Sequence, residues 1–318
     1  MRIFISLCFF LSSHTILAQK NLTFSVVTFN VENLFDEHHD KGKDDLAYLP
    51  KSQKQTSSHH DKCMKKRSPK RREECLKLDW NSSLIEKKLK HIHKSILDVS
   101  KGAPPDIVIL AEVENKKILD RLAAYFPQYQ TKVLLEGSDP RGIDNAIMTR
   151  FSLLKEPLLH RIDAGGLKKN TLKRGILEAW FQVPGGFLLR AFAVHFPAPY
   201  HPREKRVFAS YALNTLLLGG RAKGVVTIAA GDFNVTGKED SFFYRGKFSP
   251  FWQVSHLVGC HECLGSYYYK KKDSWSFLDA ILLEKSPKCR MLADSVRVGG
   301  KSKGSDHLPV YAKIRCKV

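Results

Sequence analysis

The sequence predicts a single-domain protein of the α/β class. Segments with strand patterns alternate with segments of helical period in the first half of the chain, and strand patterns dominate the second half. With 43% hydrophobic residues, this chain of 318 residues can bury a sizeable core. No shift in composition separates two cores, so we expect one domain over residues 19–318.

The first 18 residues have the three parts of a secretory signal. Arg2 supplies a basic start, residues 3–11 form an apolar stretch too short to cross a bilayer, and small-residue cleavage fits before Gln19. A buried N-terminal strand is the alternative. No other run is apolar and long enough for a transmembrane segment. We therefore expect a signal peptide over residues 1–18 and a soluble mature protein that is secreted or periplasmic.

The first predicted elements lie on either side of a polar region. Residues 24–29 predict a strand, and residues 84–99 predict a helix because their apolar side chains recur at helical spacing. Between them, residues 37–79 are polar, rich in His and Lys, and without clear periodicity. We interpret this region as a basic insertion or long, solvated loop, with residues 62–72 (KCMKKRSPKRR) as its most basic part.

The later elements follow the same rules. Pro104 and Pro105 end the helix, and residues 106–111 then predict a buried strand that delivers Glu112 at its end. The remaining predicted helices span residues 118–126 and 204–218. The remaining predicted strands span residues 146–149, 179–183, 188–194, 225–230, 278–283 and 308–314.

Six of the seven cysteines lie beyond the predicted signal, at positions 63, 75, 260, 263, 289 and 316. An even number in an exported chain favours disulfides, for which about fifteen connectivities exist. Cys63 and Cys75 are each other's only near partner, so we expect them to pair. Cys260 and Cys263 have the spacing of half a zinc site, but a second CxxC is missing, which favours one disulfide or two separate ones.

Polar residues stand at the ends of several predicted strands, where open α/β folds bind ligands. A single Asp in such a place is most often a turn former or helix cap. Asp279 differs because it lies inside an apolar run, and a buried carboxylate needs a partner such as His. The positions are Asn30, Glu112, His195, Asp232, Asn234, Asp279, Asp306 and His307. Carboxylates for a hard cation, with a His to activate water, indicate phosphodiester hydrolysis.

The segments that carry these residues resemble the endonuclease/exonuclease/phosphatase superfamily, which includes DNase I-like nucleases, abasic-site endonucleases, sphingomyelinases and inositol phosphatases. The segments are 28–35 (TFNVENLF), 109–115 (ILAEVEN), 194–196 (VHF), 231–234 (GDFN), 276–279 (SFLD) and 305–310 (SDHLPV). They fall in the family's order and span nearly the whole predicted mature chain. The first two look most like the secreted bacterial nuclease-like branch.

The resemblance implies a four-layer α/β sandwich, with two mixed sheets face to face, helices outside, and the site at one edge. It also implies a divalent metal, usually Mg²⁺, with Mn²⁺ or Ca²⁺ as alternatives. Glu112 matches the family's principal metal carboxylate, Asn30 the amide beside it, and Asp306 a second acidic position near the metal. Mg²⁺ prefers oxygen ligands, which these side chains offer.

The matched positions also suggest catalytic roles. His307 is the expected general base for the attacking water, and Asp279 would orient its imidazole. Asp232 and Asn234 would position water and hold non-bridging oxygens. His195 would donate to the phosphate or protonate the leaving group. The sequence leaves open which His is the base and which is the acid.

Three positions depart from the family pattern or compete within it. Ala111 replaces the usual Gln before the metal carboxylate, which leaves the ligand itself intact. Glu114 competes with Glu112 for the metal role, and we prefer Glu112 because it follows the apolar run directly. Arg141 lies where relatives often carry an Arg that contacts phosphate, although an Arg in a turn is an equal alternative.

The charge of the chain favours a polyanionic partner. The formal charge of +20 becomes +19 without Arg2, which attracts nucleic acid, acidic membrane surfaces or cell-wall polymers, although a solubility effect explains it equally well. Residues 62–72 and 267–272 (YYYKKK) fit a DNA or RNA backbone, so we expect a monomeric, largely nonspecific endonuclease. A sphingomyelinase-like or phosphoinositide-type phosphodiesterase ranks lower because no exposed aromatic hairpin for membrane insertion is evident. A non-catalytic binding protein ranks third because the site residues are intact.

Overall fold

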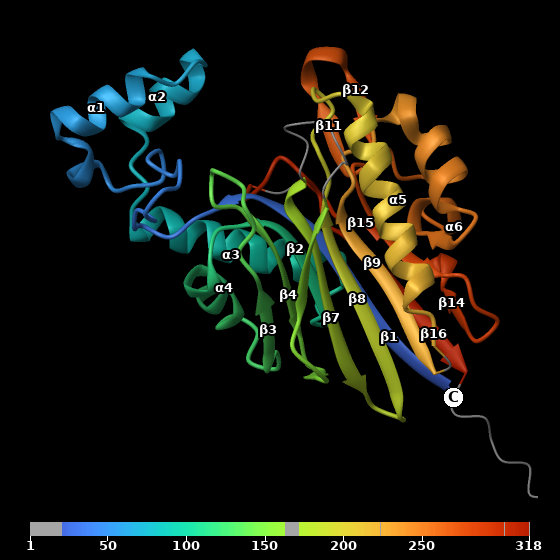
Figure 1. Cartoon of the computed structure of the whole chain (residues 1–318). Coiled ribbons are helices and arrows are strands. Elements are labelled where there is room, and N and C mark those ends of the chain that lie inside the picture. Colours follow the sequence, from blue (N-terminus) through green and yellow to red (C-terminus); the bar gives the residue numbers. More distant parts are fainter. Residues whose placement is uncertain (1–20, 163–171, 223, 302, 318) are drawn as a thin grey trace, which may run out of the picture.

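Two seven-stranded sheets form the centre of the computed structural model, which describes residues 21–162, 172–222, 224–301 and 303–317 (Figure 1). The first sheet contains β1 (Asn21–Leu34), β2 (Ile107–Val113), β3 (Thr131–Leu134), β4 (Asp144–Thr149), β14 (Cys289–Met291), β15 (Arg297–Val298) and β16 (Val310–Lys317). The second sheet contains β5 (Ser152–Leu153), β6 (Leu158–Ile162), β7 (Leu172–Val183), β8 (Phe187–His195), β9 (Val225–Asp232), β10 (Trp252–Val254) and β13 (Asp279–Glu284). β11 (Tyr267–Tyr269) and β12 (Ser274–Ser276) form a separate hairpin.

The strand order places parallel pairs at the centre of both sheets. The first sheet runs β14-β16-β1-β2-β4-β3 with β15 beside β16, and the second runs β10-β13-β9-β8-β7-β5 with β6 beside β7. β1 and β2 are parallel, as are β8 and β9, and the other named pairs are antiparallel. The parallel strands therefore bring their carboxyl ends to one edge.

The helices lie outside the two sheets. They are α1 (Ser57–Met64), α2 (Pro69–Lys77), α3 (Ser82–Val99), α4 (Lys116–Ala123), α5 (Arg203–Gly219) and α6 (Ser255–Val258). Shorter 3-10 turns are η1 (Lys51–Lys54), η2 (Gly237–Glu239), η4 (Lys270–Lys272) and η5 (Ala293–Ser295), and η3 (Ser241–Phe248) is a π-helix. Figure 1 shows α3 and α4 beside the first sheet and α5 beside the second.

The layers follow from strands that are apolar on both faces. In β1, Phe24 and Val26 join the cluster between the sheets, whereas Val27 and Phe29 join the cluster beneath α3 and α4. A third cluster lies between the second sheet, α5 and η3. Burial on both faces is the reason that β2 and β9 are continuous apolar runs. The predicted four-layer sandwich is confirmed.

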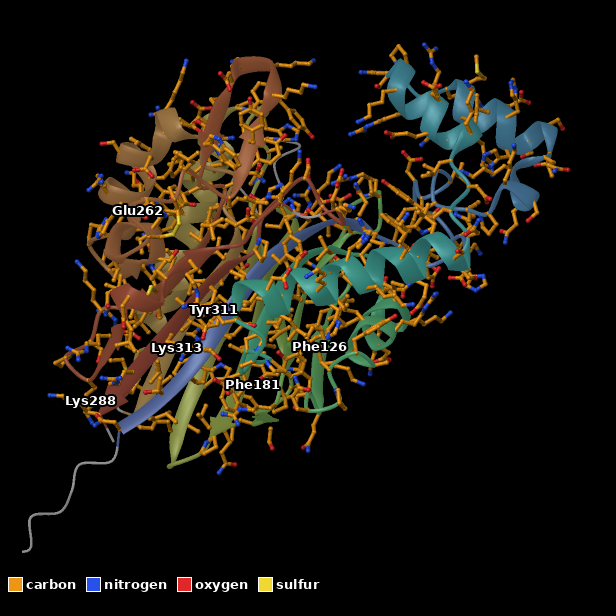
Figure 2. All side chains as sticks on the ribbon, turned by 180° about the vertical axis from the view of Figure 1, so that it is seen from behind. Phe126, Phe181, Glu262, Lys288, Tyr311 and Lys313 are labelled. Carbon is orange, nitrogen blue, oxygen red and sulfur yellow. A yellow bond between two sulfur atoms is a disulfide. The ribbon has the colours of Figure 1, made fainter. Side chains whose placement is uncertain are left out.

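The chain packs side chains into each of these layers, as a second view shows (Figure 2). Phe126, after α4, is buried in the helix-side cluster of the first sheet, and Phe181 of β7 is buried between the sheets (Figure 2). Helix α3 begins at an N-cap, Asn81, whose side chain accepts a hydrogen bond from the Leu84 amide. Its apolar stripe then fixes the helix on β1 and β2.

The basic segment 37–79 is more regular than the sequence indicated. We expected a loop there, and the structure contains η1, α1 and α2. Few residues of α1 and α2 are buried, namely His59, Cys63 and Cys75, so hydrophobic periodicity could not reveal these helices. The Cys63–Cys75 disulfide holds α1 and α2 together, whereas the longer helices α3 and α5 are held by an apolar face packed on a sheet.

The six cysteines at positions 63 to 316 form three disulfides. Cys63 pairs with Cys75 as predicted. Cys260 pairs with Cys263, which resolves the alternatives left open for that motif in favour of a single local disulfide. Cys289 pairs with Cys316 between β14 and β16, where the two residues face each other across the ladder.

Among the described residues, none of the helices combines the length and apolar character that a membrane crossing requires. Two cavities, of about 480 and 700 Å³, lie away from the strand ends considered next. The smaller is lined by Lys288, Arg290 and Arg315 among others.

Candidate active site

The predicted polar residues meet at the edge where the parallel strands end. β1 carries Asn30, β2 carries Glu112, β8 ends in His195 and β9 ends in Asp232. The antiparallel strand β13 begins at this edge, with Asp279 directly opposite Asp232 in the ladder. His307 lies shortly before β16. Sheet topology thus brings together residues that are up to 277 positions apart, from Asn30 to His307.

His307 and Asp279 form a buried ion pair at the centre of this edge. The Nδ1 atom of His307 lies 2.7 Å from Oδ2 of Asp279. The same oxygen accepts a hydrogen bond of 2.8 Å from the Ser266 hydroxyl, whose oxygen accepts the amide of Asp279 at 2.9 Å. Burial opposes a charged imidazole, but the charge and hydrogen bond of Asp279 outweigh burial and raise the pKa of His307 to about 10. Asp279 therefore fixes the ring and leaves Nε2 for other contacts.

The free Nε2 atom of His307 faces two further carboxylates. It lies 4.0 Å from Oδ2 of Asp232 and 3.9 Å from Oδ1 of Asp306. Asp232 also receives a hydrogen bond of 3.0 Å from the Asn30 side chain and one of 2.8 Å from the Asn234 amide. Burial, followed by the charge of Asp279, raises the pKa of Asp232 above its usual range.

His195 completes this group from the side of the second sheet. Its Nε2 atom lies 3.5 Å from Asp232 and 3.8 Å from Glu112. Burial, followed by the positive charges of Arg174 and Arg141, holds the pKa of His195 well below its usual value. The two imidazoles therefore differ in protonation: the surroundings of His307 favour its charged form, and those of His195 favour its neutral form.

Three carboxylates form the more open rim of the site. Glu112 accepts the Asn33 amide at 3.0 Å, and Glu32 accepts the Asp306 amide at 2.9 Å. Burial and then the charge of Asp306 raise the pKa of Glu32. Burial raises the pKa of Asp306 as well, whereas the charge of His307 lowers it. The nearby Lys88 ammonium is bonded to the carbonyls of Glu32 and Gly304, at 2.8 and 2.7 Å.

The backbone at this rim is strained. Glu32, Asn33, Glu112 and Asn234 have φ values of 48°, 58°, 67° and 52°, in the left-handed region. Each such residue costs of order 1 kcal/mol, and such conformations cluster at functional sites. At Glu112 the register of β2 shifts against both β1 and β4, which turns the carboxylate out of the ladder and towards the edge.

This donor set fits a hard divalent cation. Glu32, Glu112 and Asp306 offer carboxylate oxygens, the ligands that Mg²⁺ prefers. Burial is the largest cause of the raised pKa values of Glu32 and Asp306, and the charges of neighbouring carboxylates raise them further; a cation would offset that repulsion. Oxygen and nitrogen atoms of Asp232, Asp279 and His307 also lie within 4.8 Å of one another, but Asp279 and His307 already bind each other.

Asn30 contacts the buried residues of the candidate site. Its amide nitrogen donates to Asp232, and its oxygen accepts the Glu32 amide at 3.0 Å. The Ser305 hydroxyl donates to the Asn30 carbonyl at 2.7 Å and so ties the loop before β16 to β1. Its predicted role as a metal residue stays a prediction.

Comparison with proteins of known structure identifies the fold. An endonuclease/exonuclease/phosphatase from Bacteroides vulgatus matches 93% of this chain and 100% of its own, at 14% identity and a TM-score of 0.58. A humanized D. rerio TDP2 matches 92% and 98%, at 16% identity and a TM-score of 0.57. A mannosyl-6-phosphatase from Bacteroides thetaiotaomicron matches 92% and 99%, at 16% identity and a TM-score of 0.52. This chain therefore shares the fold of these proteins, as the resemblance to the endonuclease/exonuclease/phosphatase superfamily predicted. No family sequence model and no curated protein sequence matches.

Within the superfamily fold, the departures noted in the sequence have clear positions. Ala111 is buried in β2 beside Asn30 in the ladder, so the missing amide side chain leaves Glu112 in place. Glu114 accepts the Asp36 amide at 2.7 Å, and burial raises its pKa to about 9. Glu114 therefore supports the loop after β1, and the geometry favours Glu112 as the carboxylate of the site.

Arg141 reaches the rim of the candidate site. Its Nη1 atom lies 3.4 Å from the side-chain oxygen of Asn33, next to Glu112. The Nε atom of Arg141 lies 3.6 Å from the Asp139 carboxylate, which also forms an ion pair of 3.0 Å with Nε of Arg174. This position suits the predicted phosphate contact, which stays a prediction.

Three residues of the site, Glu32, Ser266 and Asn145, were not assigned a role from sequence, and Tyr267 was predicted only as part of the 267–272 segment that fits a nucleic-acid backbone. Glu32 and Ser266 have the contacts described above. Tyr267 pairs with His307 in an isolated bridge, with ring centroids 5.0 Å apart. Asn145 is buried at the start of β4, and its amide donates to the Ala193 carbonyl of the other sheet at 3.3 Å. Asn145 could have been found from the sequence because it directly precedes the apolar run 146–148. Ser266 and Tyr267 have no such position beside an apolar run.

Proposed function

We propose that this chain is an exported, metal-dependent phosphodiester hydrolase that cleaves nucleic acid as an endonuclease. The observation that carries the proposal is the buried His307–Asp279 pair, whose free Nε2 atom points to carboxylates at the open edge. A His oriented by a carboxylate is the arrangement used to move a proton to or from an attacking group.

The rim residues would hold the metal. Glu112, Asp306 and Glu32 are the proposed ligands, with Asn30 beside them. A divalent cation bound there would neutralise their charge, favour the neutral form of His307, and stabilise charge that develops on the phosphate. Mg²⁺ is the ion we propose because every side chain of the rim offers oxygen.

The remaining residues would bind and orient the phosphate. His307 would take the proton of the attacking water at Nε2, while Asp279 stabilises the imidazolium that results. His195, held in its neutral form, would donate a hydrogen bond to a non-bridging oxygen rather than a proton. Asp232 and Asn234 would position the water, and Arg141 would contact the phosphate from the rim.

The choice of substrate and compartment has separate support. A formal charge of +20 attracts a polyanion. Among the structural neighbours, one is named an endonuclease/exonuclease/phosphatase and another a mannosyl-6-phosphatase, so the fold alone does not select the phosphoester. Three disulfides support export to an oxidising compartment, as does the predicted signal at residues 1–18.

Plasmid nicking tests the proposal. The purified protein is incubated with supercoiled plasmid and Mg²⁺, with and without EDTA, beside His307→Gln and a matched variant, His256→Gln. His256 forms another His–Asp pair, 3.0 Å from Asp240, and its ring stacks on Phe277. We expect nicking by wild type and His256→Gln, and none with EDTA or in His307→Gln. Nicking that survives both EDTA and His307→Gln contradicts the proposed mechanism. Hydrolysis of sphingomyelin vesicles without plasmid nicking contradicts the proposed substrate.

A further inference from the structure

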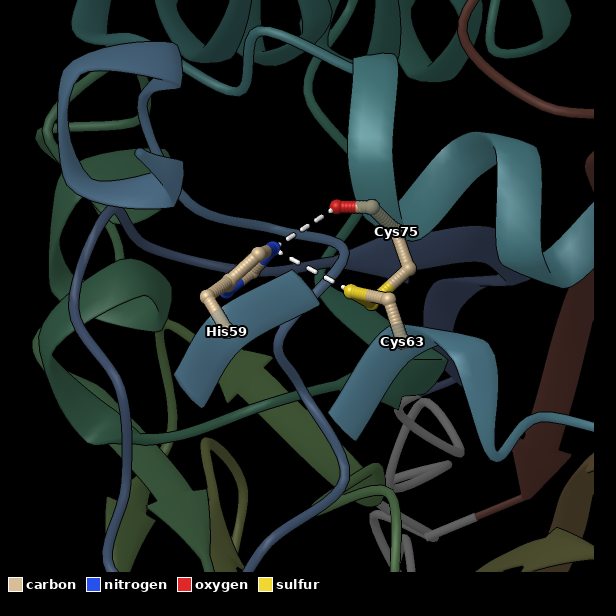
Figure 3. A group of neighbouring side chains, drawn as sticks. All are labelled: His59, Cys63 and Cys75. Atoms are coloured by element: carbon tan, nitrogen blue, oxygen red, sulfur yellow. Dashed lines mark hydrogen bonds between the residues drawn. A yellow bond between two sulfur atoms is a disulfide. The ribbon is translucent and has the colours of Figure 1, made fainter. Parts of the chain in front are cut away.

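The two helices of the basic insertion form a separate lobe, Ser57–Lys77. Figure 1 shows α1 and α2 standing away from the sandwich. The Cys63–Cys75 disulfide joins them, and His59 lies against it, with Nε2 3.2 Å from the Cys63 sulfur and 3.0 Å from the Cys75 carbonyl (Figure 3). Because the two sulfur atoms bond each other, this group is a structural centre and not a metal site. Helices of 8 and 9 residues need such a constraint to persist in water.

The lobe presents uncompensated positive charge. Residues 62–72 contain seven Lys and Arg and no acidic residue. Lys66 pairs with Asp44, and Lys70 pairs with Glu74 at 3.6 Å. The other five, within the part of the chain that the structure describes, form no ion pair; they are Lys62, Lys65, Arg67, Arg71 and Arg72. Four of the five are exposed, and Arg72 is partly exposed.

The base of the lobe is anchored to the rim of the active site. The Tyr48 ring stacks on Phe35, which directly follows β1, with centroids 4.0 Å apart. The Asp44 amide donates at 2.7 Å to the carbonyl of Pro140, the neighbour of Arg141. Lys66 of the lobe binds the Asp44 side chain. These contacts hold the lobe at a fixed place beside the proposed phosphate-binding residue.

A second basic element stands on the other side of the site. The β11–β12 hairpin is attached to His307 through Tyr267, and its turn carries the exposed Lys270, Lys271 and Lys272. Tyr268 and Tyr269 are also exposed. Figures 1 and 2 both show the hairpin and the lobe at the same end of the sandwich. The lobe therefore adds positive charge beside Arg141, and the hairpin adds positive charge beside His307.

We propose that the lobe Ser57–Lys77 is a disulfide-dependent binding arm for the backbone of a polynucleotide that also contacts the β11–β12 hairpin. The inference rests on the proposed function and adds a second, distant contact with the substrate. Charged side chains dominate the exposed surface of the lobe, and the large exposed apolar side chain described there is Met64. An arm of this composition suits phosphate groups in water better than a bilayer, which requires an apolar face. The hairpin tyrosines can stack on bases as sequence-independent contacts.

Equilibrium binding measures the arm without requiring catalysis. Fluorescence anisotropy of a labelled 40-nucleotide DNA is recorded in EDTA over a series of salt concentrations, for wild type and a Lys65→Ala, Arg67→Ala, Arg71→Ala variant. The control variant, Lys288→Ala, Arg290→Ala, Arg315→Ala, removes equal charge at the opposite end of the sheets. We expect the lobe variant to bind at least about tenfold more weakly at low salt and its salt slope to fall by about 2 to 3, with the control close to wild type. Equal weakening in both variants, or none in the lobe variant, overturns the proposal.

A second variant tests the disulfide. Cys63→Ser, Cys75→Ser keeps every charge of the lobe, and we expect it to lose DNA affinity by a similar factor while its main thermal unfolding transition stays in place. Wild-type affinity in this variant overturns the dependence on the disulfide. Binding to anionic phosphatidylglycerol vesicles that depends on the lobe, with DNA affinity unchanged in all variants, overturns the choice of partner. Lobe-dependent DNA binding by a protein that nicks no plasmid leaves this inference standing and contradicts only the proposed function.

Discussion

Two buried charged clusters in this molecule differ in how their charges are balanced. Glu178 of β7 has three donors: Arg190 Nε at 2.7 Å, the Trp180 indole and the His160 ring. The Arg190 guanidinium also bonds the Leu216 carbonyl at 2.9 Å and lies over the Phe192 ring. Burial raises the pKa of Glu178, but hydrogen bonds from the three donors lower it to about 2. This cluster is complete without any added group.

The cluster at the candidate site, around Asp232, Asp279 and His307, is incomplete by comparison. Among the described residues, Oδ1 of Asp279 and Nδ1 of His195 are buried without a hydrogen-bond partner. The pKa values of Asp232, Glu32 and Asp306 are all raised, with burial as the largest cause. Buried charge by itself therefore does not mark a functional site. A cluster whose charges balance stabilises the fold, whereas a cluster with excess acid and strained backbone is prepared for a ligand.

The largest expected effect is on catalysis at the incomplete cluster. His307→Gln removes the proposed base while keeping a polar side chain of similar size, so kcat for plasmid nicking should fall by about a thousandfold. The melting temperature should also fall, because Asp279 loses its buried counter-charge, so nicking is measured per folded molecule at a temperature well below unfolding. Time courses of plasmid nicking measure kcat, and thermal unfolding measures the melting temperature. A loss of activity that merely follows a loss of folding would erase the contrast between the clusters.

A change in the balanced cluster should reduce stability and leave activity in place. Glu178→Gln leaves Arg190 buried without its counter-charge, which should lower the free energy of unfolding by about 3 kcal/mol. Activity per folded molecule should stay near that of wild type, because Glu178 lies outside the site. Urea unfolding measures the stability, and nicking well below the transition measures the activity. A small stability change with a large activity change would show that Glu178 serves the site.

The same pair predicts a pH dependence. The pKa of Glu178 is about 2 in the folded protein and near its ordinary value of 4.5 in the unfolded chain. Its contribution to stability is therefore present above pH 4.5 and is lost as the pH falls through that range towards 2. The difference in unfolding free energy between wild type and Glu178→Gln should shrink from pH 5 to pH 3. A difference that stays constant over this range would contradict the charge-based account.

A smaller effect is expected at Ser266, which supports the proposed catalytic pair of His307 and Asp279. Ser266→Ala removes the hydroxyl that holds Asp279, which should cost about 1 kcal/mol, or roughly fivefold in kcat. The pH profile of kcat should also shift, because Asp279 sets the pKa of His307. Ser255→Ala is the matched control: its hydroxyl is equally buried and accepts the Ile281 amide of the same strand at 3.1 Å. An unshifted profile in Ser266→Ala, or an equal shift in Ser255→Ala, would make Ser266 merely structural.

The central strands of the fold and most residues of the candidate site could be predicted from the sequence, because both have a recognisable local sequence pattern. Strands such as β2 and β9 are covered on both faces and so appear as continuous apolar runs. Residues such as Glu112 and Asp232 come directly after those runs. The order of six short segments then indicated the four-layer sandwich, which the structure confirms. Position relative to an apolar run was thus sufficient for most of the edge.

The parts that escaped prediction depend on contacts that the local sequence does not encode. Helices α1 and α2 lack an apolar face and are held by a disulfide. Ser266 and Tyr267 lie in a loop and a short hairpin, and they join the site only because β13 and β16 bring Asp279 and His307 to the same place. The balance of charge around Glu178 likewise arises from the pairing of β7 with both β6 and β8, which brings His160 and Arg190 beside Glu178.

Calorimetric titration with Mg²⁺ tests the contrast between the clusters most directly. Wild type, Glu112→Gln and Glu178→Gln are titrated under identical conditions, at a temperature where all three are folded. We expect one binding event in wild type and in Glu178→Gln, and at least a tenfold weaker one in Glu112→Gln, because, of these two clusters, the one at the edge has carboxylates in excess. Wild-type affinity in Glu112→Gln, or no binding by the wild-type protein, would contradict this expectation.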